Sequence, residues 1–304
     1  MKKFAGFLAM IGLMLFAVQA QAVTLGQYAR GALVPSVIHD GAAVDTVVGI
    51  ICQVDCTGHK AKEKVTIHWT FFDVDSHHIT DGFIPCTDDD LVGFSWKAES
   101  GRNLDNVPGY LVFRSLDDNA TISANAFLVD QNKNDAIFVP VVPLKDNDIK
   151  WDRVTNVEEV VSLSNGIKRG IPFDVRYWMD PTYNAATTIV VWLTRPYVND
   201  KRKAVPMDVM AWNDNEVPKS ITISLPHELN KIVPCEIPGM PLDFVDGFIS
   251  MAMPASIDGF AYSYISSSLF GAQQTLLAAE CPNAQAGSTP QPPAGDCPCK
   301  GAGY

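Results

Sequence analysis

The chain has 304 residues and a formal net charge of −11 at pH 7, from 23 Lys and Arg against 34 Asp and Glu. A chain this acidic repels phosphate backbones, so nucleic-acid binding is not expected. Hydrophobic residues make up 47% of the sequence, which is enough to build a substantial core, and the length suits one or two domains.

Residues 1–22 have the form of a bacterial secretory signal peptide. Residues 1–3 include two lysines, residues 4–18 are an almost unbroken apolar run, and "AQA" at 20–22 supplies the small residues that a signal peptidase reads. No later run approaches the ~18 apolar residues of a transmembrane helix, so no transmembrane segment is expected in the mature chain. We therefore expect a secreted protein of the periplasm, the outer cell surface or the extracellular space.

The number of cysteines fits an oxidising compartment, where structural disulfides persist. We expect Cys86 to pair with Cys52 or Cys56, and Cys235 to pair with Cys281. The two cysteines of the terminal "CPCKGAGY" bond to each other or to another chain. An odd total leaves at least one thiol unpaired or bonded elsewhere. The disulfide candidates are Cys52, Cys56, Cys86, Cys235, Cys281, Cys297 and Cys299.

Apolar residues recur mostly with period two, which is typical of β-strands. In "KVTIHWTF" (64–71), Val65, Ile67 and Trp69 lie on one side, which predicts that His68 on the other side faces solvent. Similar alternation or short β-branched runs occur along the chain, and Gly, Pro, Asn and Asp separate them. Residues 270–280, "FGAQQTLLAAE", are compatible with either a helix or a strand.

Several strand segments recur in the same order in the two halves. "TVVGIIC", "TIHWTFFDVDS", "GFIPC" and "GYLVF" are followed later by "TIVVWLT", "MDVMAWNDNE", "KIVPC" and "GFISM". We interpret this order as a duplication; the alternative is that short β runs simply resemble one another. The sequence predicts an all-β fold of two tandem antiparallel β-sandwich domains, immunoglobulin-like or jelly-roll-like. Their expected bounds are 23–150 and 151–281, followed by a flexible Pro/Gly-rich tail at 282–304.

Polar residues crowd residues 65–90, "VTIHWTFFDVDSHHITDGFIPCTDDD". The order of strand, turn and strand favours a structural turn, because Asp and Ser side chains in turns bond to their own backbone. His77 and His78 are adjacent, so in a strand they point to opposite faces and cannot share one ion. Calcium fits the segment better than zinc, because the carboxylates offer hard oxygen ligands.

A second acidic loop, "DQNKNDAI" (130–137), has part of the spacing of a calcium-binding loop but lacks its glycine and its final acid. An Asx-rich hairpin loop is the alternative. In "DNDIKWD" (146–152) the aspartates are expected to be solvated. The weak calcium candidates, and the only cofactor sites considered, are Asp73, Asp75, Asp88, Asp130, Asn132 and Asn134.

Short catalytic motifs are missing from the sequence, so an enzyme is not expected. "HELNK" (227–231) begins like the helix of a zinc protease but has Lys231 where the second histidine belongs. No G-x-S-x-G elbow, phosphate-binding loop or haem attachment motif occurs.

The elements "GALVPSVIHDG", "DTVVGIIC", "TIVVWLTRPYV" and "GFAYSYI" resemble a group of uncharacterised secreted β-rich proteins of Gram-negative bacteria. The resemblance covers most of residues 27–280. It implies a secreted β-rich fold and no particular activity or site residues.

The function expected from these features is that of a disulfide-stabilised structural or adhesive protein of the cell surface or extracellular matrix, without catalytic activity. Its partners would be other copies of itself or other surface proteins, reached by strand addition at sandwich edges. One alternative is a carbohydrate- or calcium-binding module, with sugar-stacking aromatics drawn from Trp96, Tyr110, Tyr183 and Tyr197. Another is a secreted hydrolase whose catalytic residues are dispersed along the chain.

Overall fold

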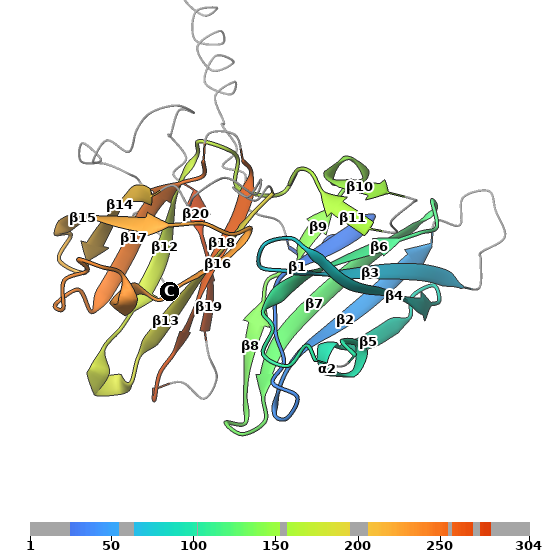
Figure 1. Cartoon of the computed structure of the whole chain (residues 1–304), viewed down its shortest axis with the longest axis horizontal. Coiled ribbons are helices and arrows are strands. Elements are labelled where there is room, and N and C mark those ends of the chain that lie inside the picture. Colours follow the sequence, from blue (N-terminus) through green and yellow to red (C-terminus); the bar gives the residue numbers. More distant parts are fainter. Residues whose placement is uncertain are drawn as a thin grey trace, which may run out of the picture.

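The computed structural model describes residues 25–54, 64–101, 103–152, 157–194, 206–254, 257–269 and 274–280. It confirms the predicted all-β fold, because two antiparallel β-sandwiches account for nearly all of its regular structure (Figure 1). Within the described ranges, α2 (Trp96–Glu99) is the only α-helix. The proposed signal peptide, Cys56, Tyr197 and residues 281–304 lie outside the described residues.

The first sandwich consists of two sheets, which we call 1a and 1b. Sheet 1a has the strand order β4-β3-β6-β1-β9, and sheet 1b has the order β5-β2-β7-β8. The strands are β1 (Gly31–Val37), β2 (Val44–Val54), β3 (Val65–Asp73), β4 (His78–Cys86), β5 (Leu91–Ser95), β6 (Gly109–Ser115), β7 (Ala120–Asp130), β8 (Asp135–Val139) and β9 (Val142–Leu144).

The second sandwich consists of sheets 2a and 2b. Sheet 2a has the order β15-β14-β17-β12-β20, and sheet 2b has the order β16-β13-β18-β19. The strands are β12 (Pro172–Trp178), β13 (Ala186–Leu193), β14 (Pro206–Asn213), β15 (Pro218–Ser224), β16 (Leu229–Ile232), β17 (Asp246–Ala252), β18 (Gly259–Ser266), β19 (Gln274–Leu277) and β20 (Ala279–Glu280). Residues 274–280 are therefore extended, which settles the helix-or-strand alternative left open for this segment.

The segment between the sandwiches forms a small hairpin of its own. It begins with the 3-10 turn η2 (Asp146–Asp148) and continues as β10 (Ile149–Asp152), paired with β11 (Val157–Val160). Two further 3-10 turns, η3 (Pro181–Tyr183) and η4 (Pro234–Glu236), lie in the second sandwich.

The two sandwiches have the same topology. Adding eleven to each strand number of sheets 1a and 1b reproduces the orders of sheets 2a and 2b. The repeated sequence segments therefore correspond to equivalent strands, with one exception. "GFIPC" lies in β4, whereas "KIVPC" spans β16 and η4, and the equivalent of β16 is β5. That one pairing of segments was wrong because it matched a shared Pro-Cys rather than a shared strand.

The cores of the two sandwiches meet at sheet 2b, which is buried on both faces. Along β13, Ile189 and Val191 point into the second sandwich, whereas Val190 and Trp192 pack against residues of the first. All four side chains are fully buried, which explains why β13 reads as a continuous apolar run rather than an alternating one.

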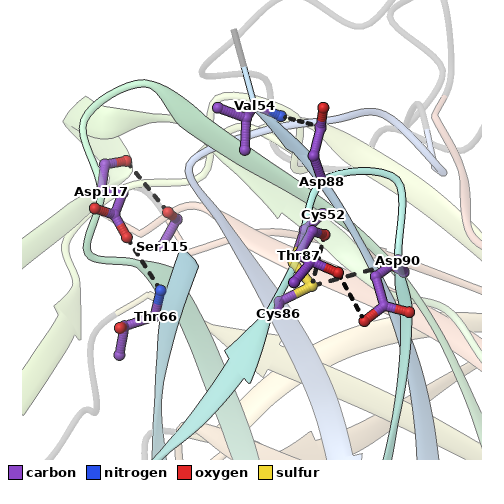
Figure 2. The surroundings of a disulfide bond; sticks show 9 residues. All are labelled: Cys52, Val54, Thr66, Cys86, Thr87, Asp88, Asp90, Ser115 and Asp117. Carbon is purple, nitrogen blue, oxygen red and sulfur yellow. Dashed lines mark hydrogen bonds between the residues drawn. A yellow bond between two sulfur atoms is a disulfide. The ribbon is translucent and has the colours of Figure 1, made fainter. Parts of the chain in front are cut away.

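A disulfide between Cys52 and Cys86 joins β2 of sheet 1b to β4 of sheet 1a (Figure 2). This selects Cys52 over Cys56 as the partner of Cys86. The acidic loop that follows is fastened to the end of β2, because Val54 N donates to Asp88 Oδ1 and Asp89 N donates to the Cys52 carbonyl. The disulfide and the loop that carries Asp88 and Asp89 therefore both stabilise this corner of the first sandwich.

Cys235 is exposed and has no disulfide partner among the described residues. Cys281, its expected partner, lies outside them, so this pairing stays a prediction.

Replacing Cys52 and Cys86 together by alanine should lower the free energy of unfolding by about 2–4 kcal/mol. The bond closes a loop with a sequence separation of 34 and so restricts the unfolded chain. Urea denaturation of the mature protein measures the loss, with Ser224→Ala, at an exposed position, as the control that keeps every cysteine. Equal stability of the double variant and the control would contradict the structural role of this disulfide.

Candidate functional site

Much of the outer face of sheet 1a is covered, which changes the environment of its polar residues, whereas Phe83 on the edge strand β4 remains 56% exposed. The hairpin β10–β11 and sheet 2b provide this cover, and His68 and Thr70 are both buried beneath it. The expectation that His68 faces solvent is therefore wrong. Alternation placed it correctly on the face opposite Trp69, but a hairpin about 90 residues later in the chain covers that face.

Four titratable side chains and a hydroxyl form a connected network under the hairpin. Glu158, on β11, lies 2.6 Å from His68 Nδ1 and accepts a hydrogen bond of 2.5 Å from Thr70 Oγ1. The other ring nitrogen of His68 lies 3.0 Å from Asp81 Oδ2. Asp81 Oδ1 lies 3.2 Å from His78 Nε2, so the network runs from a fully buried carboxyl to a partly exposed imidazole.

Opposing effects act on the pKa of His68. Burial lowers this pKa because it desolvates the charged ring, but hydrogen bonds and Coulomb attraction from Glu158 and Asp81 outweigh burial and raise it above 6.5. The imidazolium is thus the partner that allows a carboxylate to sit fully buried at position 158. Arg114 adds a second cation to this face, with its guanidinium 5.1 Å from the ring centre of Trp151.

Replacing His68 with glutamine should destabilise the protein by about 3–5 kcal/mol, because it leaves the buried Glu158 without its charged partner. Since the folded-state pKa of His68 is raised, its stabilisation is complete below pH 6.5 and is lost as pH rises through the folded value. The difference in unfolding free energy, measured by urea denaturation, should therefore be largest in mildly acidic buffer. His77→Gln is the control, since its ring is 66% exposed. Similar losses in both variants would refute the network.

A cleft of about 400 Å³ lies between the two sandwiches, and His78 belongs to both the network and the cleft wall. The β3–β4 turn contributes much of the wall, and the hairpin and the second sandwich contribute the rest. Carboxyl groups outnumber cationic side chains in the lining. The titratable side chains that line it are Asp75, His77, His78, Tyr110, Lys150, Asp152, Glu159 and Glu228.

Glu228 is the buried carboxyl of the cleft, with 3% of its surface exposed. Desolvation raises its pKa well above 4.5, the negative charge of Glu159 adds to the rise, and a hydrogen bond with Tyr110 opposes it. The Tyr110 hydroxyl also bonds to Ser76 Oγ, at 3.1 Å. Because Tyr110 is buried among these acids, its own pKa is raised well above 10.

Direct contacts between the sandwiches hold the cleft wall in place. The backbone amides of Glu228 and Leu229 both donate to the carbonyl of Val74, over 3.1 and 3.2 Å. His227 Nδ1 lies 2.5 Å from Asp75 Oδ1. These bonds fix the β3–β4 turn of the first sandwich to the start of β16 in the second.

Replacing Glu228 with glutamine should stabilise the protein increasingly as pH rises. A carboxyl whose folded-state pKa is raised stabilises the fold only while protonated, so this contribution falls from pH 4.5 upward until the folded value is passed. The variant should gain at most about 1.4 kcal/mol per pH unit relative to the wild type. Chemical denaturation across pH measures the gain. Glu236→Gln, at an exposed position of the same sandwich, is the control; equal pH profiles for all three proteins would contradict the assignment.

The proposed calcium ligands cap turns in the structure. Asp73 Oδ1 accepts hydrogen bonds from the amides of Asp75 and His77, each at 2.9 Å. Asp130 Oδ1 accepts from the amides of Asn132 and Lys133. Asn134 adopts a positive φ of 52° in the same loop. Asp75 instead contacts His227, and Asp88 contacts the end of β2. Neither carboxyl converges with the other proposed calcium ligands.

Within the part of the chain that the structure describes, no three His, Cys, Asp or Glu side chains are placed to hold a metal ion.

The aspartates of "DNDIKWD" (146–152) differ in their environments. Asp146, on the surface, lies 3.0 Å from Arg30. Asp148, expected in solvent, is fully buried and accepts hydrogen bonds from Ser162 and Ser164. Asp148 therefore stabilises the segment between the sandwiches by accepting these hydrogen bonds.

The proposed sugar-stacking aromatics are not gathered at one surface. Trp96 and Tyr110 are buried in the first sandwich, which contradicts their expected exposure. Tyr183 is 38% exposed and lies in η3 of the second sandwich. Tyr197 lies outside the described residues. The apolar face of the short helix explains Trp96, which packs 4.2 Å from Phe71 between ring centres.

The cleft contains a hydroxyl and an oriented imidazole, but they do not form a nucleophile and base pair. Ser76 Oγ is bonded to Tyr110, and among the described residues no hydrogen bond joins it to His78. The arrangement offers carboxyl and hydroxyl groups for binding a small polar molecule.

Sequence reasoning missed Glu158 and Glu228, the two buried carboxyls. "NVEEVVSL" (156–163) does carry a signal, because in a strand Glu158 lies on the same face as Val160. "HELNK" (227–231) is interpreted above only as an incomplete zinc-protease motif, although its glutamate directly precedes the buried Leu229 at the start of β16.

Comparison with known proteins finds no matching family model, no matching curated protein and no matching solved structure. The class that the coordinates define is that of a tandem antiparallel β-sandwich protein. None of the described helices is long and apolar enough to cross a membrane.

Proposed function

We propose that this chain is an exported structural or adhesive protein of the cell surface or extracellular matrix, without catalytic activity. The observation that carries the proposal is the buried apolar joint between the sandwiches. Trp192, Phe260 and Tyr262 of sheet 2b belong to the same buried cluster as the core of the first sandwich. Interfaces between domains permit motion unless they are large and hydrophobic. A joint of this kind holds two surfaces at a fixed spacing, as a scaffold requires.

An aromatic contact and two hydrogen bonds also stabilise the joint between the sandwiches. Tyr110 and Trp192 meet edge to face with 5.5 Å between ring centres, and the Tyr262 side chain bonds to Ser36. Thr275 Oγ1 donates to the Phe138 carbonyl over 2.6 Å, so the edge strands β19 and β8 lie against each other. Two sheet edges are thereby protected, while β4 and β15 remain outer strands of their sheets.

The purified mature protein should associate with itself or bind cells or extracellular glycans. Light scattering after size-exclusion chromatography across a concentration series measures self-association, and binding to whole cells and to a glycan panel measures adhesion. A protein that is strictly monomeric and binds none of these surfaces would overturn the proposal. Breakdown of ester, glycoside or peptide substrates would overturn its non-catalytic part.

A second candidate function is the binding of a small polar ligand in the cleft, and the cleft itself favours it. Its volume of about 400 Å³ falls in the range of ligand pockets, and it lies between two domains, where such pockets concentrate. Excess carboxyl groups favour a cationic or hydroxyl-rich molecule over an anion. A ligand that binds only the native state raises the melting temperature. Diaminobutane and glucose should do so if this function holds, and succinate should not.

A further inference from the structure

The joint between the sandwiches is asymmetric, although the sandwiches are equivalent. The outer face of sheet 1a meets the outer face of sheet 2b. Sheet 1a is equivalent to sheet 2a, and sheet 2b is equivalent to sheet 1b. The joint is therefore head to tail, and it leaves one outer face of each type unused, that of sheet 1b in the first sandwich and that of sheet 2a in the second. A head-to-tail contact can be repeated from one molecule to the next, because it uses a different surface on each partner and leaves the other surface of each partner free.

Residue-level equivalences confirm that the faces correspond. Thr46 and Thr187 each bridge the backbone of the preceding strand, accepting from an amide and donating to the carbonyl of Ile38 or Trp178. After β3, Asp73 Oδ1 accepts two amides, and after β14, Asn213 Oδ1 accepts the amides two and four residues further on. The two sandwiches thus match position by position.

A stacked aromatic pair occupies the same place on sheets 1a and 2a. Phe72 and Tyr110 stack with 5.0 Å between ring centres, and Trp212 and Phe248 stack with 6.0 Å. In both pairs the second residue follows a glycine whose Cβ would collide with a backbone carbonyl. Phe72 and Tyr110 are buried under the second sandwich, whereas Trp212 and Phe248 are only partly buried.

The opposite half of the joint has an unused counterpart on sheet 1b. In sheet 2b, Trp192 is paired with Leu229, the first residue of β16, and both are buried in the joint. In sheet 1b the equivalent pair is Ile51 with Leu91, the first residue of β5. Leu229 is 1% exposed, whereas its equivalent Leu91 is 66% exposed.

We propose that a second copy of this chain docks through the outer face of its sheet 1b on the outer face of sheet 2a, repeating between molecules the joint that holds the two sandwiches together. This inference rests on the proposed structural function and specifies its partner and surfaces. Phe248 of one copy then meets Ile51 of the next, as Tyr110 meets Trp192 within the chain. The docked pair keeps one unused face of each type, so association yields linear stacks.

Electrostatics make the repeated joint weaker than the internal one. The position of His227, which faces Asp75 in the internal joint, is occupied in sheet 1b by Asp89, and the position of Asp75 is occupied by Asn215. The exposed Asp90 and Asp214 lie at the positions equivalent to Glu228 and Val74, which contact each other in the internal joint. Like charges oppose docking, and salt screens them over about 8 Å at physiological ionic strength. Stacking should therefore strengthen as salt increases.

The test uses the mature protein and two single variants, Leu91→Asp for sheet 1b and Trp212→Ser for sheet 2a. Light scattering of the wild type should show mass rising with concentration, and more steeply at higher salt. Each variant should need at least about tenfold more protein for the same association, as when a central interface residue is removed. Leu242→Asp, at a fully exposed position outside both faces, is the matched control and should behave as the wild type.

Mixing the two variants separates a head-to-tail contact from a symmetric one. Each variant retains the face that the other lacks, so an equimolar mixture should form dimers and no larger species. Association that persists in both variants, or a mixture that stays monomeric while the wild type assembles, would overturn the proposal. A wild type that is monomeric but binds cells or glycans would overturn stacking and leave the proposed function standing.

A photo-crosslinking amino acid at position 212 identifies the occupant of sheet 2a directly. A crosslink between two chains, mapped near Leu91, supports docking of a second copy. A crosslink within one chain to residues 281–304 would show that the chain covers this face with its own C-terminal segment, and would overturn the proposal.

Discussion

The burial of Glu158 is the constraint on which the rest of the molecule depends. A carboxylate with no exposed surface is tolerated only with a cation and hydrogen-bond donors around it, and His68 and Thr70 of β3 supply them. This requirement fixes the hairpin β10–β11 against sheet 1a. The chain then leaves the hairpin at a defined place and direction, from which the second sandwich begins.

The position of the second sandwich in turn determines the cleft. Sheet 2b covers another part of the outer face of sheet 1a, and its buried aromatic residues form one core with the first sandwich. At the margin of this contact the packing becomes polar, with Glu228 and Tyr110 bonded to each other at the cleft. A stable joint and a cavity for small molecules are consequences of the same arrangement, because two curved sheets cannot touch along their whole length.

Local patterns predicted the strands but not their environment. Alternation in "KVTIHWTF" identified the two faces of β3 correctly, and "TTIVVWLT" was recognised as a strand without alternation. Whether a second face is covered depends on segments far along the chain, so His68 and Asp148 were wrongly expected in solvent. Trp96 was misjudged for the same reason. The pattern around Glu158 places this acid on a strand face, but one carboxyl among valines looks like a solvated face until its partner is in place.

The disulfide has a mechanical consequence for the first sandwich. Under tension, a domain lengthens by the contour of its unravelled chain, at roughly 3.4 Å per residue. The Cys52–Cys86 bond withholds a span of 34 residues from extension, on the order of 115 Å. The second sandwich has no such bond between its described residues. Pulled from both ends, the first sandwich would therefore lengthen by less than its full chain contour, because the span between Cys52 and Cys86 stays closed.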